Sequence, residues 1–72
     1  MIQLAPPPPV AINFDTAELY VMTCYHNNYS DWRFPNPIEV REHYIGGWNT
    51  TDYPYGYKDT EQVWRVTPVR TI

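Results

Sequence analysis

The spacing of apolar side chains in the first half of the chain predicts a β-hairpin. Residues 17–25 place Leu19 and every second residue after it on one face of a strand, and neither face is strongly polar. Residues 26–30 include two asparagines, which favour a turn because asparagine tolerates left-handed backbone conformations. Residues 31–34 would then return as a short second strand that ends before Pro35.

A short helix is predicted after the hairpin, because the signals that start and end helices flank residues 37–45. Asn36 is a good N-cap, Pro37 suits the first helical position, and Glu39 stands where a capping box requires an acid. The two glycines that follow residue 45 are expected to end the helix. At about eight residues such a helix is unstable alone and must pack on a sheet.

The second half of the chain predicts one more strand, and the beginning of the chain predicts an extended arm. Residues 48–60 show neither an alternating nor a helical pattern and are expected to form a loop. Residues 61–67 would form the last strand, which Pro68 ends or moves to a sheet edge. The four prolines from Pro6 to Pro9 favour an extended, solvated polyproline II conformation.

Together these elements predict a small α+β fold. We expect a three-stranded sheet with one short helix in ββαβ order, preceded by a disordered, proline-rich N-terminal arm. Residues 1–12 would be the flexible arm and residues 13–72 a single α+β domain. A folded unit of about 60 residues lies near the lower limit for a fold without disulfides or metals.

Aromatic residues must supply much of the core of this domain, because large aliphatic side chains are few. The 72 residues include 7 Tyr, 3 Trp and 2 Phe, and each buried ring removes a large apolar area from water. The rings expected in the core are Trp64, Tyr20 and Phe34. A domain of this size cannot bury every ring, so several in the predicted loop should be exposed. These are Trp48, Tyr53, Tyr55 and Tyr57.

The sequence also bears on membranes and on the cellular compartment. No apolar run approaches the roughly 20 residues that cross a bilayer. The first residues lack the cationic and apolar regions of a signal peptide. Cys24 is the single cysteine, which excludes an internal disulfide and favours a reducing cytoplasm.

No catalytic or metal-binding motif is recognisable. Cys24 and His26 lie two residues apart, but a structural zinc site needs four ligands and His43 is the only other imidazole. Cys24 and His43 could supply a nucleophile and a base, yet nothing near them in sequence supplies an orienting group or an oxyanion hole. No glycine-rich phosphate-binding loop opens a helix. We therefore expect no enzyme activity, no metal and no cofactor.

Binding to another protein is the function that the composition favours. Interface centres are enriched in Tyr, Trp and Arg, which this chain has in excess. Residues 13–45 carry five acids and two arginines, a net charge of −3, whereas residues 46–72 carry three acids and three basic residues. The acidic half should steer the chain toward a basic partner, with contact to nucleic acid only inside a larger complex. Both acids of the predicted helix, Glu39 and Glu42, are expected on its exposed side. The predicted partner-binding residues are Asp15, Glu18, Asp31, Trp32, Glu39, Glu42, Trp48, Tyr53, Tyr55 and Tyr57.

Three features carry a resemblance to a known group. They are the proline-rich start APPPP at residues 5–9, the order of predicted elements, and the sequence VWRVTPVR at residues 63–70. With these, the chain resembles the small RNA polymerase-binding regulators of phages, in particular the transcription inhibitors and antiterminators of Xanthomonas phages. The resemblance implies a monomer in the host bacterial cytoplasm that binds host RNA polymerase near the RNA exit region. It further implies that the protein blocks promoter recognition and promotes readthrough of intrinsic terminators, without chemistry of its own.

Two other binding functions remain open. The first is a phage inhibitor of a host defence nuclease, of the anti-CRISPR type, which small size and acidity fit equally well. The second is a carbohydrate-binding module with Trp48, Tyr53 and Tyr55 as a sugar platform, although a reducing compartment counts against it.

Overall fold

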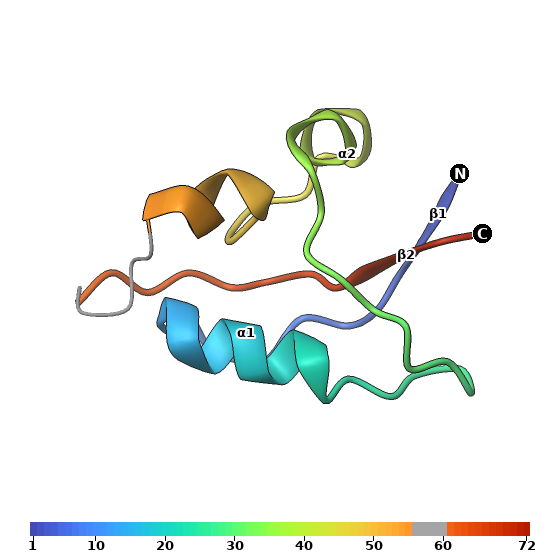
Figure 1. Cartoon of the computed structure of the whole chain (residues 1–72), viewed down its shortest axis with the longest axis horizontal. Coiled ribbons are helices and arrows are strands. Elements are labelled where there is room, and N and C mark those ends of the chain that lie inside the picture. Colours follow the sequence, from blue (N-terminus) through green and yellow to red (C-terminus); the bar gives the residue numbers. More distant parts are fainter. Residues whose placement is uncertain (56–60) are drawn as a thin grey trace.

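The helices and strands are arranged around the C-terminal segment of the chain. The computed structural model describes residues 1–55 and 61–72, apart from the side chains of residues 53 and 54. Its elements in chain order are β1 (Ile2–Leu4), α1 (Phe14–Met22), α2 (Pro37–His43), the 3₁₀-helix η1 (Thr50–Tyr55) and β2 (Val69–Thr71). The segment that ends in β2 runs between α1 on one side and η1 and α2 on the other (Figure 1).

The sheet joins the two ends of the sequence. β1 and β2 pair antiparallel, with Gln3 opposite Arg70, and the N and C ends lie side by side in Figure 1. On the other edge of β2, Arg33 and Val69 exchange two backbone N–H···O hydrogen bonds of 2.8 Å. The short sheet is therefore held on both edges of β2.

The prediction of a three-stranded sheet with one helix in ββαβ order is wrong. The described residues form two strands in one antiparallel sheet and two α-helices, so the fold is still α+β. Most of residues 17–25 belong to α1 and not to a strand. The described residues 61–67 contain no strand, and Trp64 forms only an isolated bridge with Ile12.

α1 forms because a cap and a helical spacing of apolar residues coincide. Asn13 Oδ1 accepts a hydrogen bond from Thr16 N at 2.8 Å, which satisfies one of the free amides of the first turn. Phe14, Ala17 and Val21 are buried at intervals of three and four residues, as on one side of a helix. The same residues fit an alternating pattern only in part, and packing of this side decides in favour of the helix.

The predicted asparagine turn is confirmed, but the predicted hairpin around it is wrong. Asn27 and Asn28 have φ of 53° and 68°, the left-handed region that asparagine tolerates. His26 and Tyr29 exchange backbone hydrogen bonds of 3.0 Å across the turn. The chain then leaves α1 and pairs with β2 through Arg33, because a helix offers no free edge for a returning strand.

α2 begins as predicted and ends earlier than predicted. Asn36 Oδ1 accepts from Glu39 N at 2.8 Å, and Glu39 Oε1 accepts from Asn36 N at 2.9 Å. The capping box is therefore confirmed. The helix ends at His43, before the two glycines, because Tyr44 adopts the left-handed conformation with φ 55° and ψ 41°.

A glycine is required where the chain after α2 meets the C-terminal segment. Trp48 N donates a hydrogen bond to Arg65 O at 2.9 Å, so the two backbones lie in direct contact. Gly47 has φ 92°, and a Cβ on it would overlap the Arg65 carbonyl oxygen. Only glycine combines this φ with so close an approach.

The prediction of a disordered N-terminal arm is wrong. Residues 2–4 form β1, and Ala5 and Pro8 are buried. Ala5 N donates to Pro68 O at 2.9 Å, and the Tyr20 hydroxyl donates to Pro6 O at 2.8 Å. The prolines remove backbone donors, but their carbonyls still accept hydrogen bonds and their rings still pack.

The core is aromatic, as predicted, but a different tryptophan lies at its centre. Its buried cluster consists of Phe14, Ala17, Val21, Phe34, Trp48 and Val66. The prediction for Phe34 is confirmed, whereas the prediction of an exposed Trp48 is wrong: it is 0 % exposed, and its Nε1 donates to Ile12 O at 2.8 Å. Trp64, predicted in the core, is 42 % exposed and covers the Trp48 ring edge-on at 4.4 Å between centroids. Tyr20 is partly buried against the cluster.

Candidate protein-binding surface

Two tryptophans predicted to contact a partner are buried. Trp32 Nε1 donates a hydrogen bond to Tyr29 O at 2.8 Å, and its ring lies 5.9 Å from that of His26. The Trp32 indole therefore packs against the asparagine turn, between His26 and Tyr29. Trp48 is at the centre of the core. Neither ring is available to a partner unless the domain opens.

The prediction that Glu39 is exposed is also wrong. Glu39 is buried, and its two carboxylate oxygens each accept a hydrogen bond of 2.8 Å from the Arg33 guanidinium. The Arg33 bonds, together with the bond from Asn36 N, lower the pKa of Glu39 to about 2. Sequence spacing placed Glu39 on the outside of a helix, whereas the ion pair turns it toward the sheet.

Asp31 forms the second ion pair of the described residues. Arg70 Nε donates to Asp31 Oδ1 at 2.7 Å and Nη2 to Oδ2 at 3.2 Å, which lowers the pKa of Asp31. The Arg70 guanidinium also lies 3.6 Å from the centroid of the Tyr29 ring and donates to Gln3 Oε1 at 2.8 Å. The charge division seen in the sequence is therefore reduced, because an arginine from the neutral half neutralises an acid of the acidic half.

Asp15 and Glu18 lie together on α1, beside apolar residues that sequence analysis did not select. Leu19 is 61 % exposed and Met22 is 74 % exposed. Because successive helical residues turn by about 100°, these four side chains fall on one side of the helix, away from its buried residues. We name Asp15, Glu18, Leu19 and Met22 the α1 outer face.

Tyr25, three residues beyond the end of α1, is a further exposed apolar side chain. Its side chain is 70 % exposed, and its hydroxyl donates to Asn28 Oδ1 at 3.3 Å. Leu19, Met22 and Tyr25 were assigned to a two-sided strand in the sequence analysis, which would have buried them. The sequence did contain a signal for the helix, because Asn13 is a residue that caps helices. A helix that begins after Asn13 places Leu19 on its exposed side.

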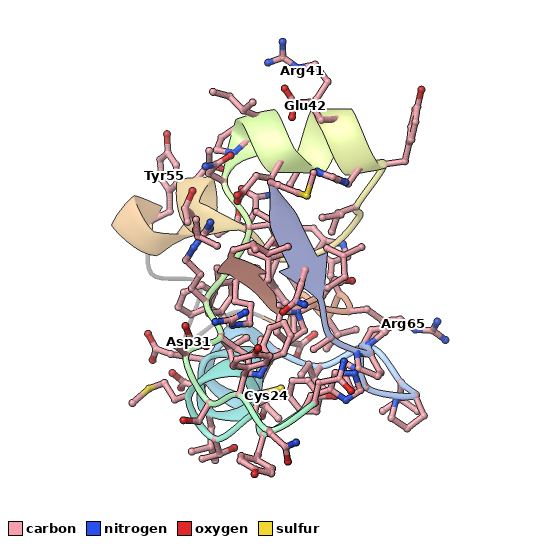
Figure 2. All side chains as sticks on the ribbon, turned by 90° about the vertical axis from the view of Figure 1, so that its right-hand side faces the viewer. Cys24, Asp31, Arg41, Glu42, Tyr55 and Arg65 are labelled. Carbon is pink, nitrogen blue, oxygen red and sulfur yellow. The ribbon has the colours of Figure 1, made fainter. Side chains whose placement is uncertain are left out.

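The remaining predicted residues lie far from the α1 outer face. Glu42 is exposed on α2 next to Arg41, and Tyr55 is exposed on η1. Figure 2 shows these three at one end of the molecule, opposite the end that holds α1 and Asp31. The side chain of Tyr53 and the whole of Tyr57 fall outside the described residues. The ten predicted residues therefore do not form one surface.

A shallow cavity of about 220 Å³ lies beside η1. Its described lining consists of Gly47, Asn49, Asp52 and Trp64. Asp52 Oδ2 accepts a hydrogen bond from Asn49 N at 2.9 Å, so this carboxylate holds the start of η1. The sugar platform predicted from sequence cannot form as proposed, because Trp48 is buried.

Two further kinds of site are absent from the part of the chain that the structure describes. They contain no group of three or more His, Cys, Asp or Glu side chains that could hold a metal ion. Among them, no helix is long and apolar enough to span a membrane. Burial raises the pKa of the Cys24 thiol, which disfavours the thiolate form that a nucleophile needs.

Comparison with known proteins does not assign the chain to a family. It matched no protein-family model, no curated protein and no solved structure. The chain's own surface and its resemblance to small phage regulators therefore remain as the indications of function.

Proposed function

We propose that this chain is a non-catalytic domain that binds another protein through the α1 outer face and Tyr25. The observation that carries the proposal is the exposure of Leu19, Met22 and Tyr25 along one helix and the turn after it. Large exposed apolar side chains that gather on a small domain, as Leu19 and Met22 do on one side of α1, favour burial against a partner. Methionine is suited to this role because its flexible side chain adapts to irregular surfaces.

The acids of the same face specify the chemistry of the partner. Asp15 and Glu18 flank the apolar side chains on α1. A complementary surface therefore has an apolar centre with lysine or arginine at its edge. Association with it should be faster at low salt, because salt screens the attraction between the two surfaces.

We further propose that the partner is bacterial RNA polymerase, acting in the host bacterial cytoplasm. The support for this partner is the resemblance to small phage regulators in the proline-rich start and the C-terminal sequence, since the predicted order of elements is not found in the structure. On this proposal the domain occupies a site on the polymerase, inhibits initiation and promotes readthrough of intrinsic terminators. It does so by binding alone, so its effect saturates when each polymerase carries one copy.

The binding face is tested with purified polymerase and paired variants. Leu19→Ser with Met22→Ser removes apolar contact without changing charge, and we expect the Kd to rise about tenfold or more, as for central interface residues. Ile38→Ser is the matched control, since Ile38 is a similarly exposed apolar residue on α2. Equal effects of both changes, or none, would contradict the assignment of the face.

The partner is tested by affinity purification and by transcription. We expect the chain to retain polymerase subunits from a bacterial lysate and to change initiation or termination in a purified assay. Retention of a nuclease complex instead would favour the anti-CRISPR type of inhibitor. An effect that keeps growing with incubation time would contradict a non-catalytic role.

A further inference from the structure

Two residues of the proline segment, three positions apart, are buried against the fold. Ala5 and Pro8 are buried, whereas Pro6, Pro7 and Pro9 are exposed. Each residue from 5 to 8 precedes a proline, which keeps its backbone extended. Because a polyproline II helix has three residues per turn, one ridge faces the core and the exposed prolines form the outward ridges. The side turned to solvent is the side that polyproline-binding grooves contact.

Hydrogen bonds hold the segment against the rest of the fold. Ala5 N donates to Pro68 O at 2.9 Å, and Pro6 O accepts from the Tyr20 hydroxyl at 2.8 Å. Further on, Ile12 and Trp64 exchange backbone hydrogen bonds of 2.9 and 3.0 Å. A ligand that is ordered before binding loses less conformational entropy on binding than a free peptide does.

The structure also supplies a cation that the proline sequence lacks. Arg65 is exposed, and its Nη2 donates to Pro9 O at 3.2 Å across 56 positions of sequence. Figure 2 shows Arg65 projecting from the side of the molecule, far from Arg41. In residues 1–55 and 61–72 the two ion pairs, Arg33–Glu39 and Arg70–Asp31, do not involve Arg65. Its guanidinium can therefore meet a carboxylate of a partner.

We propose that this side of the molecule is a ligand for an SH3-type groove. The ligand is assembled from two parts of the chain and consists of Pro6, Pro7, Pro9 and Arg65. Such a groove binds exposed prolines between aromatic side chains, and an acidic pocket at its end would receive the guanidinium as a charge-assisted hydrogen-bonding partner. The two parts meet only in the folded protein. We name Pro6, Pro7, Pro9 and Arg65 the proline–arginine surface.

This surface is separate from the α1 outer face. Tyr20, which holds Pro6, and Met22 are two residues apart and therefore lie about 160° apart around α1. A partner on the proline–arginine surface would leave Leu19 and Met22 accessible. The two surfaces could be occupied at the same time.

The proposal is tested by titrating the full chain with a panel of purified SH3 domains that have acidic pockets. We expect at least one domain to bind, and Arg65→Ala to raise the Kd about tenfold or more, as expected for loss of a charge-assisted hydrogen bond. A synthetic peptide of residues 4–12 lacks both Arg65 and the fold that orders the segment, so it should bind more weakly than this variant. Arg41→Ala is the matched control and should bind like the parent.

Three results would overturn the proposal. They are no binding by any SH3 domain at millimolar concentration, equal binding by the Arg65→Ala variant and the parent, and an equal loss in Arg41→Ala. If Arg65→Ala loses its dispersed amide spectrum, Arg65→Gln and the variant with Pro6→Ala and Pro9→Ala give the same test, and both should bind more weakly.

Discussion

Replacing Glu39 by glutamine should destabilise the fold at neutral pH and remove part of its acid sensitivity. A pKa of about 2 in the fold, against 4.5 for an ordinary glutamate, corresponds to about 3 kcal/mol. The Arg33 side chain is partly exposed, so water screens the pair and we expect about 2 kcal/mol. Glutamine keeps the size of the side chain and can still accept the bond from Asn36 N.

The pH dependence distinguishes the ion pair from a packing effect. Because folding lowers the pKa of Glu39, its contribution is fully present above about pH 4.5 and is lost as the pH falls toward 2. Urea unfolding of the parent and of Glu39→Gln at a series of pH values measures the difference in unfolding free energy. We expect this difference to be about 2 kcal/mol at neutral pH and to shrink steadily below pH 4.5.

Glu42 provides a control on the same helix. It is exposed, so Glu42→Gln should change the unfolding free energy by less than about 0.5 kcal/mol. A destabilisation by Glu39→Gln that stayed constant from neutral to acid pH would refute the reasoning. So would an equal pH-dependent loss in the Glu42 variant.

Three further predictions concern the core, a turn and the sheet. Trp48→Ala should cost about 3–5 kcal/mol and leave a domain of this size largely unfolded in thermal melts, whereas Trp64→Ala should keep a cooperative melt. Gly47→Ala should cost more than about 2 kcal/mol, measured by urea unfolding, because both its φ and its contact with residue 65 exclude a Cβ; a near-neutral result would contradict that contact. Removal of residues 1–4 should lower the Tm by roughly 4–8 °C for each kcal/mol of lost sheet pairing, and an unchanged Tm would show that β1 contributes nothing.

Signals confined to a few residues were interpreted correctly from the sequence. The capping box of α2 requires only Asn36 and Glu39, and the left-handed turn requires only Asn27 and Asn28. In each case the side chain bonds to, or sterically permits, the backbone beside it. Such preferences depend little on the rest of the fold.

Residues 17–25 were assigned wrongly because two periods overlap there. Val21 belongs both to an alternating series and to a helical series with Phe14 and Ala17. The helical series buries one side against Phe34 and Trp48, which come from distant parts of the chain. Local pattern alone could not decide between the two, since the deciding contacts are tertiary.

Because the sequence analysis predicted a strand where the structure has α1, it missed half of the α1 outer face. Asp15 and Glu18 were selected for their charge, which does not depend on secondary structure. Leu19 and Met22 were placed in a buried strand, and only the helix exposes them. Trp48 and not Trp64 lies in the core, and this too depends on a tertiary contact. The Trp48 indole bonds to Ile12, which is 36 positions away in the sequence.

The pairing of β1 with β2 has a consequence for the synthesis of the chain. Gln3 leaves the ribosome 67 residues before its partner Arg70. Throughout that interval the edge of β1 has no strand to pair with, and the asparagine turn lacks the guanidinium that holds Tyr29 and Asp31. The emergence of β2 therefore completes the sheet and the ion pair in one step, so this domain reaches its folded state only after β2 has left the ribosome.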